Sequence, residues 1–211
     1  MNRALDIIAK ILSVVLYPLF IPTYGIVLFC VAQAAHVASL PWIWVLIAIV
    51  GTLVLTCILP VTTIWIMMRR GVVKDLYIDD PRQRTMPYLY SCLGFGFWAY
   101  LLAETLHAPL FLVSIAIGAT VAIGLVSIIN RWWKISAHLT GMGGLLGGIM
   151  SYCLGIGAIP TWGTWVVLLG LSWLLMVARL RLDAHTGAQV STGWLLGMIC
   201  TFVPYLIMSH V

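Results

Sequence analysis

Charged residues are scarce in this chain: only 8% of its 211 residues are charged, whereas 63% are hydrophobic. The mean hydropathy is +1.09. A soluble domain carries about a quarter charged residues, which cover its surface. This composition excludes an ordinary soluble domain, and we therefore expect an integral membrane protein.

The sequence also lacks the signals of several other classes. Its five cysteines stand singly in apolar segments, without CxxC or Cys/His ligand spacing, which predicts buried thiols. The first apolar run is too long for a cleavable signal peptide, and no internal repeat indicates an inverted-repeat transporter. In this setting the net charge of +5 indicates membrane topology and an anionic substrate rather than nucleic acid.

Seven apolar stretches are long enough to span a bilayer, which takes about 20 residues in a helix. They cover roughly 11–33, 41–68, 87–106, 109–130, 138–157, 161–178 and 190–209. The links between several of them are short, which predicts antiparallel helical hairpins and leaves no room for a second domain. We therefore predict one all-α domain over residues 1–211, a polytopic transmembrane helix bundle of six to seven spans.

Most of the few charged residues gather in three segments, 69–84, 131–138 and 179–189. Two predicted crossings separate each segment from the next, so all three fall on the same side of the membrane and can converge. Ionisable groups at the edge of the hydrocarbon are costly, and such groups are functional candidates by default. Convergence of the three segments is therefore the basis of the functional prediction.

The residue types in these segments suit chemistry on a phosphate ester. Two histidines, His138 and His185, accompany a serine and several cations, Arg179 among them. One imidazole can attack phosphorus, the other can protonate the leaving oxygen, and guanidinium groups can hold the phosphate oxygens. Each residue alone has a structural reading: Ser136 is a good helix N-cap, the histidines suit a membrane interface, and the cations suit helix ends.

The three segments resemble the signature motifs of the type 2 phosphatidic acid phosphatase (PAP2) superfamily. The third motif corresponds to Ala178-Arg179, five residues, His185, three residues and Gln189. The second corresponds to Ile135-Ser136-Ala137-His138, and the first is matched loosely by Lys74, Arg82, Arg84 and Pro87. The resemblance spans most of the chain and implies a PAP2-like core.

The resemblance also implies a mechanism without a metal or other cofactor. His185 would be the nucleophile that forms a phosphohistidine, and His138 would protonate the leaving group. Gln189 would orient His185. The phosphate would be held by Lys74, Arg82 or Arg84, Arg179 and the Ser136 hydroxyl, helped by backbone N–H groups at the start of the fifth predicted helix. The implied partners are a lipid phosphate and the bilayer, with no nucleic acid.

The chain departs from the family pattern at two positions. Gln189 stands where the family has an aspartate, so the nucleophile lacks a negative partner unless Asp183 supplies it. Ala137 replaces the motif glycine and narrows the phosphate pocket. Two alternatives stay open. A phosphotransferase would form the same phosphohistidine in its first step, and Gln189 favours a lipid-binding protein with weakened catalysis.

The sequence places the chain as a multi-pass protein, which we expect in the bacterial inner membrane. All eleven lysines and arginines fall on the motif side under seven crossings, and the positive-inside rule places that side in the cytoplasm. PAP2 proteins usually work on the extracytoplasmic face, so both orientations stay open. The substrate is open as well: phosphatidate, phosphatidylglycerol phosphate, a polyprenyl pyrophosphate or a lipid A phosphate would each fit.

Overall fold

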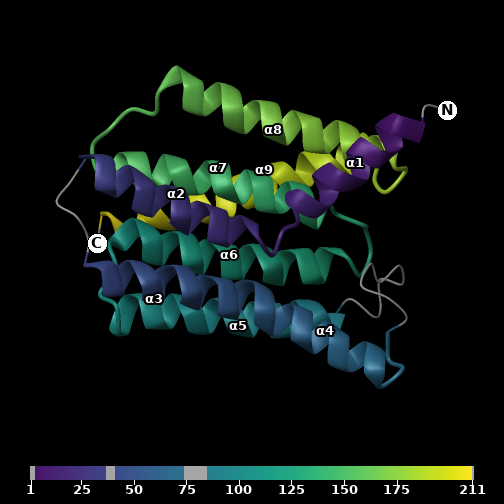
Figure 1. Cartoon of the computed structure of the whole chain (residues 1–211), viewed down its shortest axis with the longest axis horizontal. Helices are drawn as coiled ribbons and strands as arrows, with labels where there is room; N and C mark the ends of the chain where they lie inside the picture. Colours follow the sequence, from purple (N-terminus) through teal and green to yellow (C-terminus); the bar gives the residue numbers. More distant parts are fainter. Residues whose placement is uncertain (1–2, 37–40, 74–84, 211) are drawn as a thin grey trace.

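The computed structural model describes residues 3–36, 41–73 and 85–210, and in these ranges it contains helices and no β-strand (Figure 1). The elements are α1 (Arg3–Val15), α2 (Ile21–His36), α3 (Trp42–Leu53), η1 (Val54–Ile58), α4 (Leu59–Arg69), α5 (Thr85–Glu104), α6 (Leu110–Ile129), α7 (Ala137–Gly155), α8 (Trp162–Arg181) and α9 (Gly187–Met208). The predicted all-α class is therefore confirmed.

Four described helical segments are long and apolar enough to cross a bilayer. They are Trp42–Arg69, which joins α3, the π-helical turn η1 and α4, together with Leu110–Ile129, Trp162–Arg181 and Gly187–Met208. The chain is therefore a membrane protein. Helices α5 and α7 match two further predicted stretches, but the total of six to seven spans stays a prediction.

The first predicted span, over residues 11–33, is wrong. The structure divides this stretch into α1 and α2, which are joined by a turn over 16–20. Pro18 has no backbone N–H to continue α1, and Pro22 fits the first turn of the next helix. The length and apolar character of the stretch hid this break, which places the end of α1 beside the predicted site.

Helices α7 and α9 pack along each other more extensively than any other described pair. Glycines allow this approach: a Cβ atom on Gly193 would lie 2.6 Å from the Ser136 carbonyl oxygen, and one on Gly197 would collide with the Thr140 carbonyl oxygen. The sequence motif of small residues four apart is typical of close helix contact in membranes. These contacts bring the starts of α7 and α9 together.

A buried apolar cluster supports the same end of the bundle. Leu139 and Met142 of α7, Leu175 of α8 and Val190 of α9 are almost completely buried. They pack with Leu16, the first residue of the α1–α2 turn, and with Ile21, the first residue of α2. We call this end the motif end: it carries the start of α7, the end of α8 and the start of α9. The cluster fixes the three segments relative to one another.

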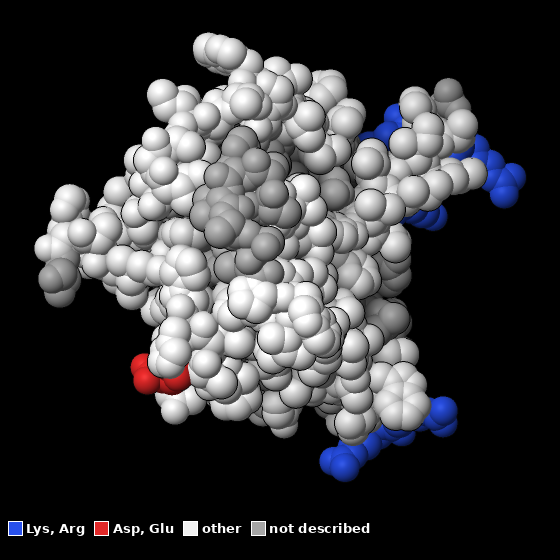
Figure 2. All heavy atoms as spheres, turned by 60° about the vertical axis from the view of Figure 1, so that its left-hand side comes forward, with Lys and Arg blue, Asp and Glu red and all other residues white. Residues whose placement is uncertain are grey.

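Cations gather at the same end of the described bundle. Arg69 lies in the last turn of α4, and Arg179 and Arg181 lie in the last turn of α8. On the face drawn in Figure 2, the lysine and arginine side chains lie along the right-hand edge, away from the carboxylate on the left. Cations at the C-terminal end of a helix interact favourably with its dipole.

Candidate functional site

Two of the three predicted segments meet at the motif end. The backbone N–H of Ser136 donates to the Gln189 carbonyl oxygen at 3.3 Å. The Nδ1 atom of His185 lies 3.2 Å from the carbonyl oxygen of Lys134. The segment before α7 is therefore hydrogen-bonded to the segment that joins α8 to α9, and the predicted meeting of these two segments is confirmed.

The hydrogen bonds of His185 determine its tautomer. Its Nδ1 faces two oxygen atoms, the Lys134 carbonyl at 3.2 Å and Oε1 of Gln189 at 3.3 Å. Both oxygens only accept, so Nδ1 must carry the proton, which leaves a lone pair on Nε2 of the neutral ring. Among the described residues no hydrogen bond engages Nε2. The ring therefore presents an unprotonated nitrogen, as a nucleophile requires.

Gln189 is itself held in place by a helix cap. Its side-chain Oε1 accepts from the Thr186 backbone N–H at 3.1 Å, and its backbone N–H donates to the Thr186 hydroxyl at 3.4 Å. This reciprocal pair is the capping box at the start of α9. Because the N–H of Thr186 needs an acceptor, the amide oxygen rather than the amide nitrogen faces His185. The cap thereby orients the histidine's partner.

The surroundings of His185 favour its neutral form. Burial lowers the pKa of this imidazole to about 4, and the positive charge of Arg179 acts in the same direction. The hydrogen bonds to Lys134 and Gln189 oppose this shift. At neutral pH the ring is therefore uncharged.

His138 is bonded to a residue outside the three predicted segments. Its Nε2 lies 3.0 Å from the backbone carbonyl oxygen of Ser13, near the end of α1. A carbonyl only accepts, so Nε2 carries a proton and Nδ1 is the ring nitrogen left to exchange one. The Tyr17 ring packs edge-on against the imidazole, with centroids 5.3 Å apart.

Arg179 is also linked to α1. Its Nη1 donates to the Ser13 hydroxyl at 3.3 Å. Two residues further along α8, Nε of Arg181 lies 2.8 Å from a carboxylate oxygen of Asp6. The sequence signal for this partnership was present: Arg3, Asp6, Lys10 and Ser13 recur every three or four residues in an otherwise apolar helix.

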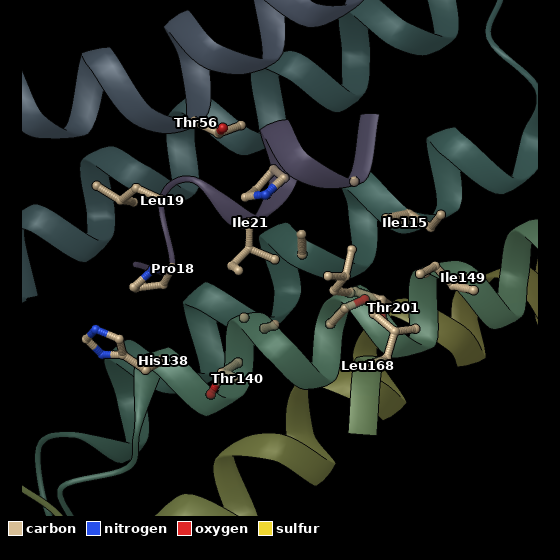
Figure 3. A pocket seen from close by; sticks show the side chains of 18 of the residues that line it. Pro18, Leu19, Ile21, Thr56, Ile115, His138, Thr140, Ile149, Leu168 and Thr201 are labelled. Carbon is tan, nitrogen blue, oxygen red and sulfur yellow. Dashed lines mark hydrogen bonds between the residues drawn. The ribbon is translucent and has the colours of Figure 1, made fainter. Parts of the chain in front are cut away.

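A large cavity, of about 1610 Å³, connects these groups with the apolar interior of the bundle. At the motif end it is lined by His138, Arg179 and His185, together with Lys10 and Lys134. In Figure 3, His138 and Thr140 come from the start of α7, Ile149 from further along that helix, Leu168 from α8 and Thr201 from α9. The cavity therefore has a cationic end and a long apolar body.

Some predicted residues lie away from this cavity. Ser136 is completely buried, and its hydroxyl accepts from the Leu139 N–H as the N-cap of α7. Ser136 and Gln189 do not line the cavity. Gln189 is hydrogen-bonded to His185, which does line it. The phosphate-binding role of Ser136 stays a prediction. Lys74, Arg82 and Arg84 lie outside the described residues.

Asp183 is not a partner of His185 in the described hydrogen bonds. It is exposed, lines the cavity, and adopts a left-handed conformation with φ of 50° where α8 ends. Ala137, at the position that corresponds to a glycine in the PAP2 motif, also lines the cavity. The neutral Gln189 is therefore the side-chain partner that the described structure gives to His185.

The described residues contain no group of three or more His, Cys, Asp and Glu side chains that could hold a metal ion. No protein-family model, curated protein or solved structure matches this chain.

Proposed function

We propose that the chain is a PAP2-type lipid phosphatase with six to seven membrane spans, which hydrolyses a phosphomonoester or pyrophosphate on a lipid. The observation that carries the proposal is the cavity on which His138, Arg179 and His185 converge. Its cationic end suits a phosphate group, and its apolar body suits the hydrocarbon of a lipid. The tautomer of His185 adds support, because its bonded Nδ1 leaves Nε2 for attack.

The proposed reaction has two steps. In the first, the Nε2 lone pair of His185 attacks phosphorus, and the bond from phosphorus to the leaving oxygen breaks with its electron pair. His138 gives a proton to that oxygen, and the lipid alcohol departs. In the second, water attacks phosphorus while His138 takes its proton. The phosphorus–nitrogen bond then breaks, which releases inorganic phosphate and restores His185.

The neighbouring groups stabilise the charges that develop in these steps. The phosphorylated imidazole is cationic, and its Nδ1–H remains hydrogen-bonded to the Lys134 carbonyl and Gln189. Arg179 holds the phosphate oxygens that do not react. His138 needs a proton before it can act as an acid, and the negative charge of a bound phosphate favours the protonated, cationic imidazole.

The first test is the metal requirement. Purified protein in detergent micelles is expected to release phosphate from dioctanoyl phosphatidate, and to keep this rate within about twofold after EDTA treatment, because His185 rather than a metal-bound water attacks phosphorus. The measurement is phosphate release before and after chelation, across phosphatidate and farnesyl pyrophosphate. Complete inhibition that a divalent ion reverses would contradict the phosphohistidine mechanism.

The second test concerns Gln189 and separates a full enzyme from a lipid-binding protein with weakened catalysis. Gln189→Glu keeps the length of the side chain, so its carboxylate can still accept from both Thr186 and His185. Aspartate is one methylene shorter and reaches less far. Because the tautomer of His185 is already correct, the negative charge is expected to raise kcat by only about tenfold, through stabilisation of the imidazolium.

The pH dependence provides an independent measurement for the same variant. Protonation of His185 removes its lone pair, so kcat/KM of the wild type should decline on the acidic side around the histidine's pKa of about 4. A carboxylate favours the protonated ring, and the acidic limb of Gln189→Glu should therefore move to higher pH. Asp183→Asn is the control and should leave rate and profile unchanged. A slower Asp183→Asn with an unaltered Gln189→Glu would assign the orienting role to Asp183.

A further inference from the structure

Helix α1 presents two different faces. Ala9 and Ser13 are buried against the bundle, and Asp6 on the same side bonds Arg181 of α8. The other side is apolar and about half exposed, with Ile7, Ile8, Ile11, Val14 and Val15. Such a helix suits the membrane interface, with its apolar side in lipid. Its polar side is turned to the motif end.

Ser13 bonds two groups of the candidate site at once. Its backbone carbonyl accepts from Nε2 of His138 at 3.0 Å, and its hydroxyl accepts from Nη1 of Arg179 at 3.3 Å. The hydroxyl in turn donates to the Ala9 carbonyl at 2.9 Å, which fixes its orientation. The side chain of Ser13 is only 7% exposed, so little water competes for these bonds.

The break between α1 and α2 explains why this carbonyl is open to His138. In a continuing helix, the N–H of Tyr17 would bond to the Ser13 carbonyl; here it bonds to Val14 instead, at 3.2 Å. Pro18, the next residue, has no N–H to donate. The last carbonyls of a helix need partners from elsewhere, and the imidazole of His138 is one such partner.

We propose that Ser13 is a positioning residue for the phosphatase reaction, holding His138 through its carbonyl and Arg179 through its hydroxyl; this inference rests on the proposed function. The carbonyl keeps Nε2 protonated, so that Nδ1 is the atom that carries a proton to the leaving oxygen. The bond strengthens when His138 becomes cationic, because a charged donor makes a stronger hydrogen bond. The hydroxyl fixes where Arg179 meets the phosphate.

The test begins with the hydroxyl. Ser13→Ala is expected to raise KM for dioctanoyl phosphatidate roughly three- to tenfold, with kcat within about twofold, because Arg179 loses an acceptor while His138 keeps the carbonyl. Ser13→Thr restores the hydroxyl and should recover most of the affinity. Ser172→Ala is the matched control: Ser172 is also buried, and its hydroxyl bonds the carbonyl four residues earlier in α8.

A second variant loosens the whole helix. Asp6→Asn removes the negative charge that holds α1 to Arg181, so both contacts of Ser13 should weaken. Its kcat should fall severalfold more for phosphatidate, which has a poor leaving group, than for farnesyl pyrophosphate, because only the former depends strongly on the proton from His138. Glu104→Gln, at the exposed end of α5, is the control for loss of a carboxylate.

Binding of inorganic phosphate, followed by ³¹P NMR line broadening, makes the inference independent of turnover. Weaker phosphate binding in Ser13→Ala than in Ser172→Ala supports the inference, even if the wild type shows no turnover. Absence of turnover in the wild type would contradict the proposed function but not the role of Ser13. Equal binding and equal KM in these two variants would overturn the inference. A higher kcat/KM in Ser13→Ala than in the wild type would also overturn the inference. It would mean that the contacts of α1 with His138 and Arg179 compete with the phosphate for these groups.

Discussion

Turnover is expected to disappear when His185 is replaced by alanine. The chain has His138 on the same cavity, but in the proposed reaction its free nitrogen, Nδ1, carries the proton to the leaving oxygen and does not attack phosphorus. Loss of a catalytic nucleophile typically lowers kcat by at least about 10⁴-fold. The measurement is phosphate release from phosphatidate and from farnesyl pyrophosphate, and the loss should be the same for both.

His107→Ala is the matched control for this variant. His107 lies between α5 and α6 and does not line the cavity, so its removal should leave the rate unchanged. The phosphohistidine can also be sought directly: brief incubation with ³²P-labelled phosphatidate should label the wild type and not His185→Ala. Label that persists in His185→Ala would assign the nucleophile to another residue.

The largest substrate-dependent effect is expected for His138→Ala. Departure of an alkoxide needs a proton, and general acid catalysis contributes about 10²- to 10⁴-fold. Phosphatidate turnover should therefore fall by that factor. With farnesyl pyrophosphate the leaving group is farnesyl phosphate, which is far less basic than an alkoxide. Turnover of this substrate should therefore fall by less than about tenfold. The ratio of the two losses is the measurement that assigns the role.

His138→Gln is a useful companion, because its amide nitrogen can donate to the Ser13 carbonyl but cannot deliver a proton. It should preserve the position of α1 and still show the same dependence on the leaving group. Equal and complete loss with both substrates in both variants would contradict the separation into nucleophile and acid.

Several features could be predicted from local sequence. Each apolar stretch after residue 41 corresponds to helix within a few residues, because about 20 apolar residues suit a helix in hydrocarbon. The capping of α7 by Ser136 could also be predicted, because a serine directly before an apolar run is typical of a helix N-cap. The pairing of the two histidine segments followed from counting crossings, and the glycines of α7 and α9 indicated close contact.

The first predicted span failed because an apolar run long enough for one membrane helix contains Pro18. A proline in an apolar run is compatible with a kinked membrane helix, so the local signal does not separate a kink from a full break. The structure resolves the question through packing: Leu16, the first residue of the turn, and Ile21, the first residue of α2, both enter the cluster around Leu139. That apolar contact stabilises the turn.

The sequence by itself determined that this is a helical membrane protein with two histidine segments on one side, because hydrophobicity and crossing parity depend only on the order of residues. Tertiary structure decided what each imidazole bonds. Nδ1 of His185 is held by Lys134 and Gln189, and Nε2 of His138 by Ser13, which is 125 positions away in the chain. Such bonds depend on where α1, α7 and α9 dock, and no local pattern encodes a donor–acceptor distance of about 3 Å between distant segments.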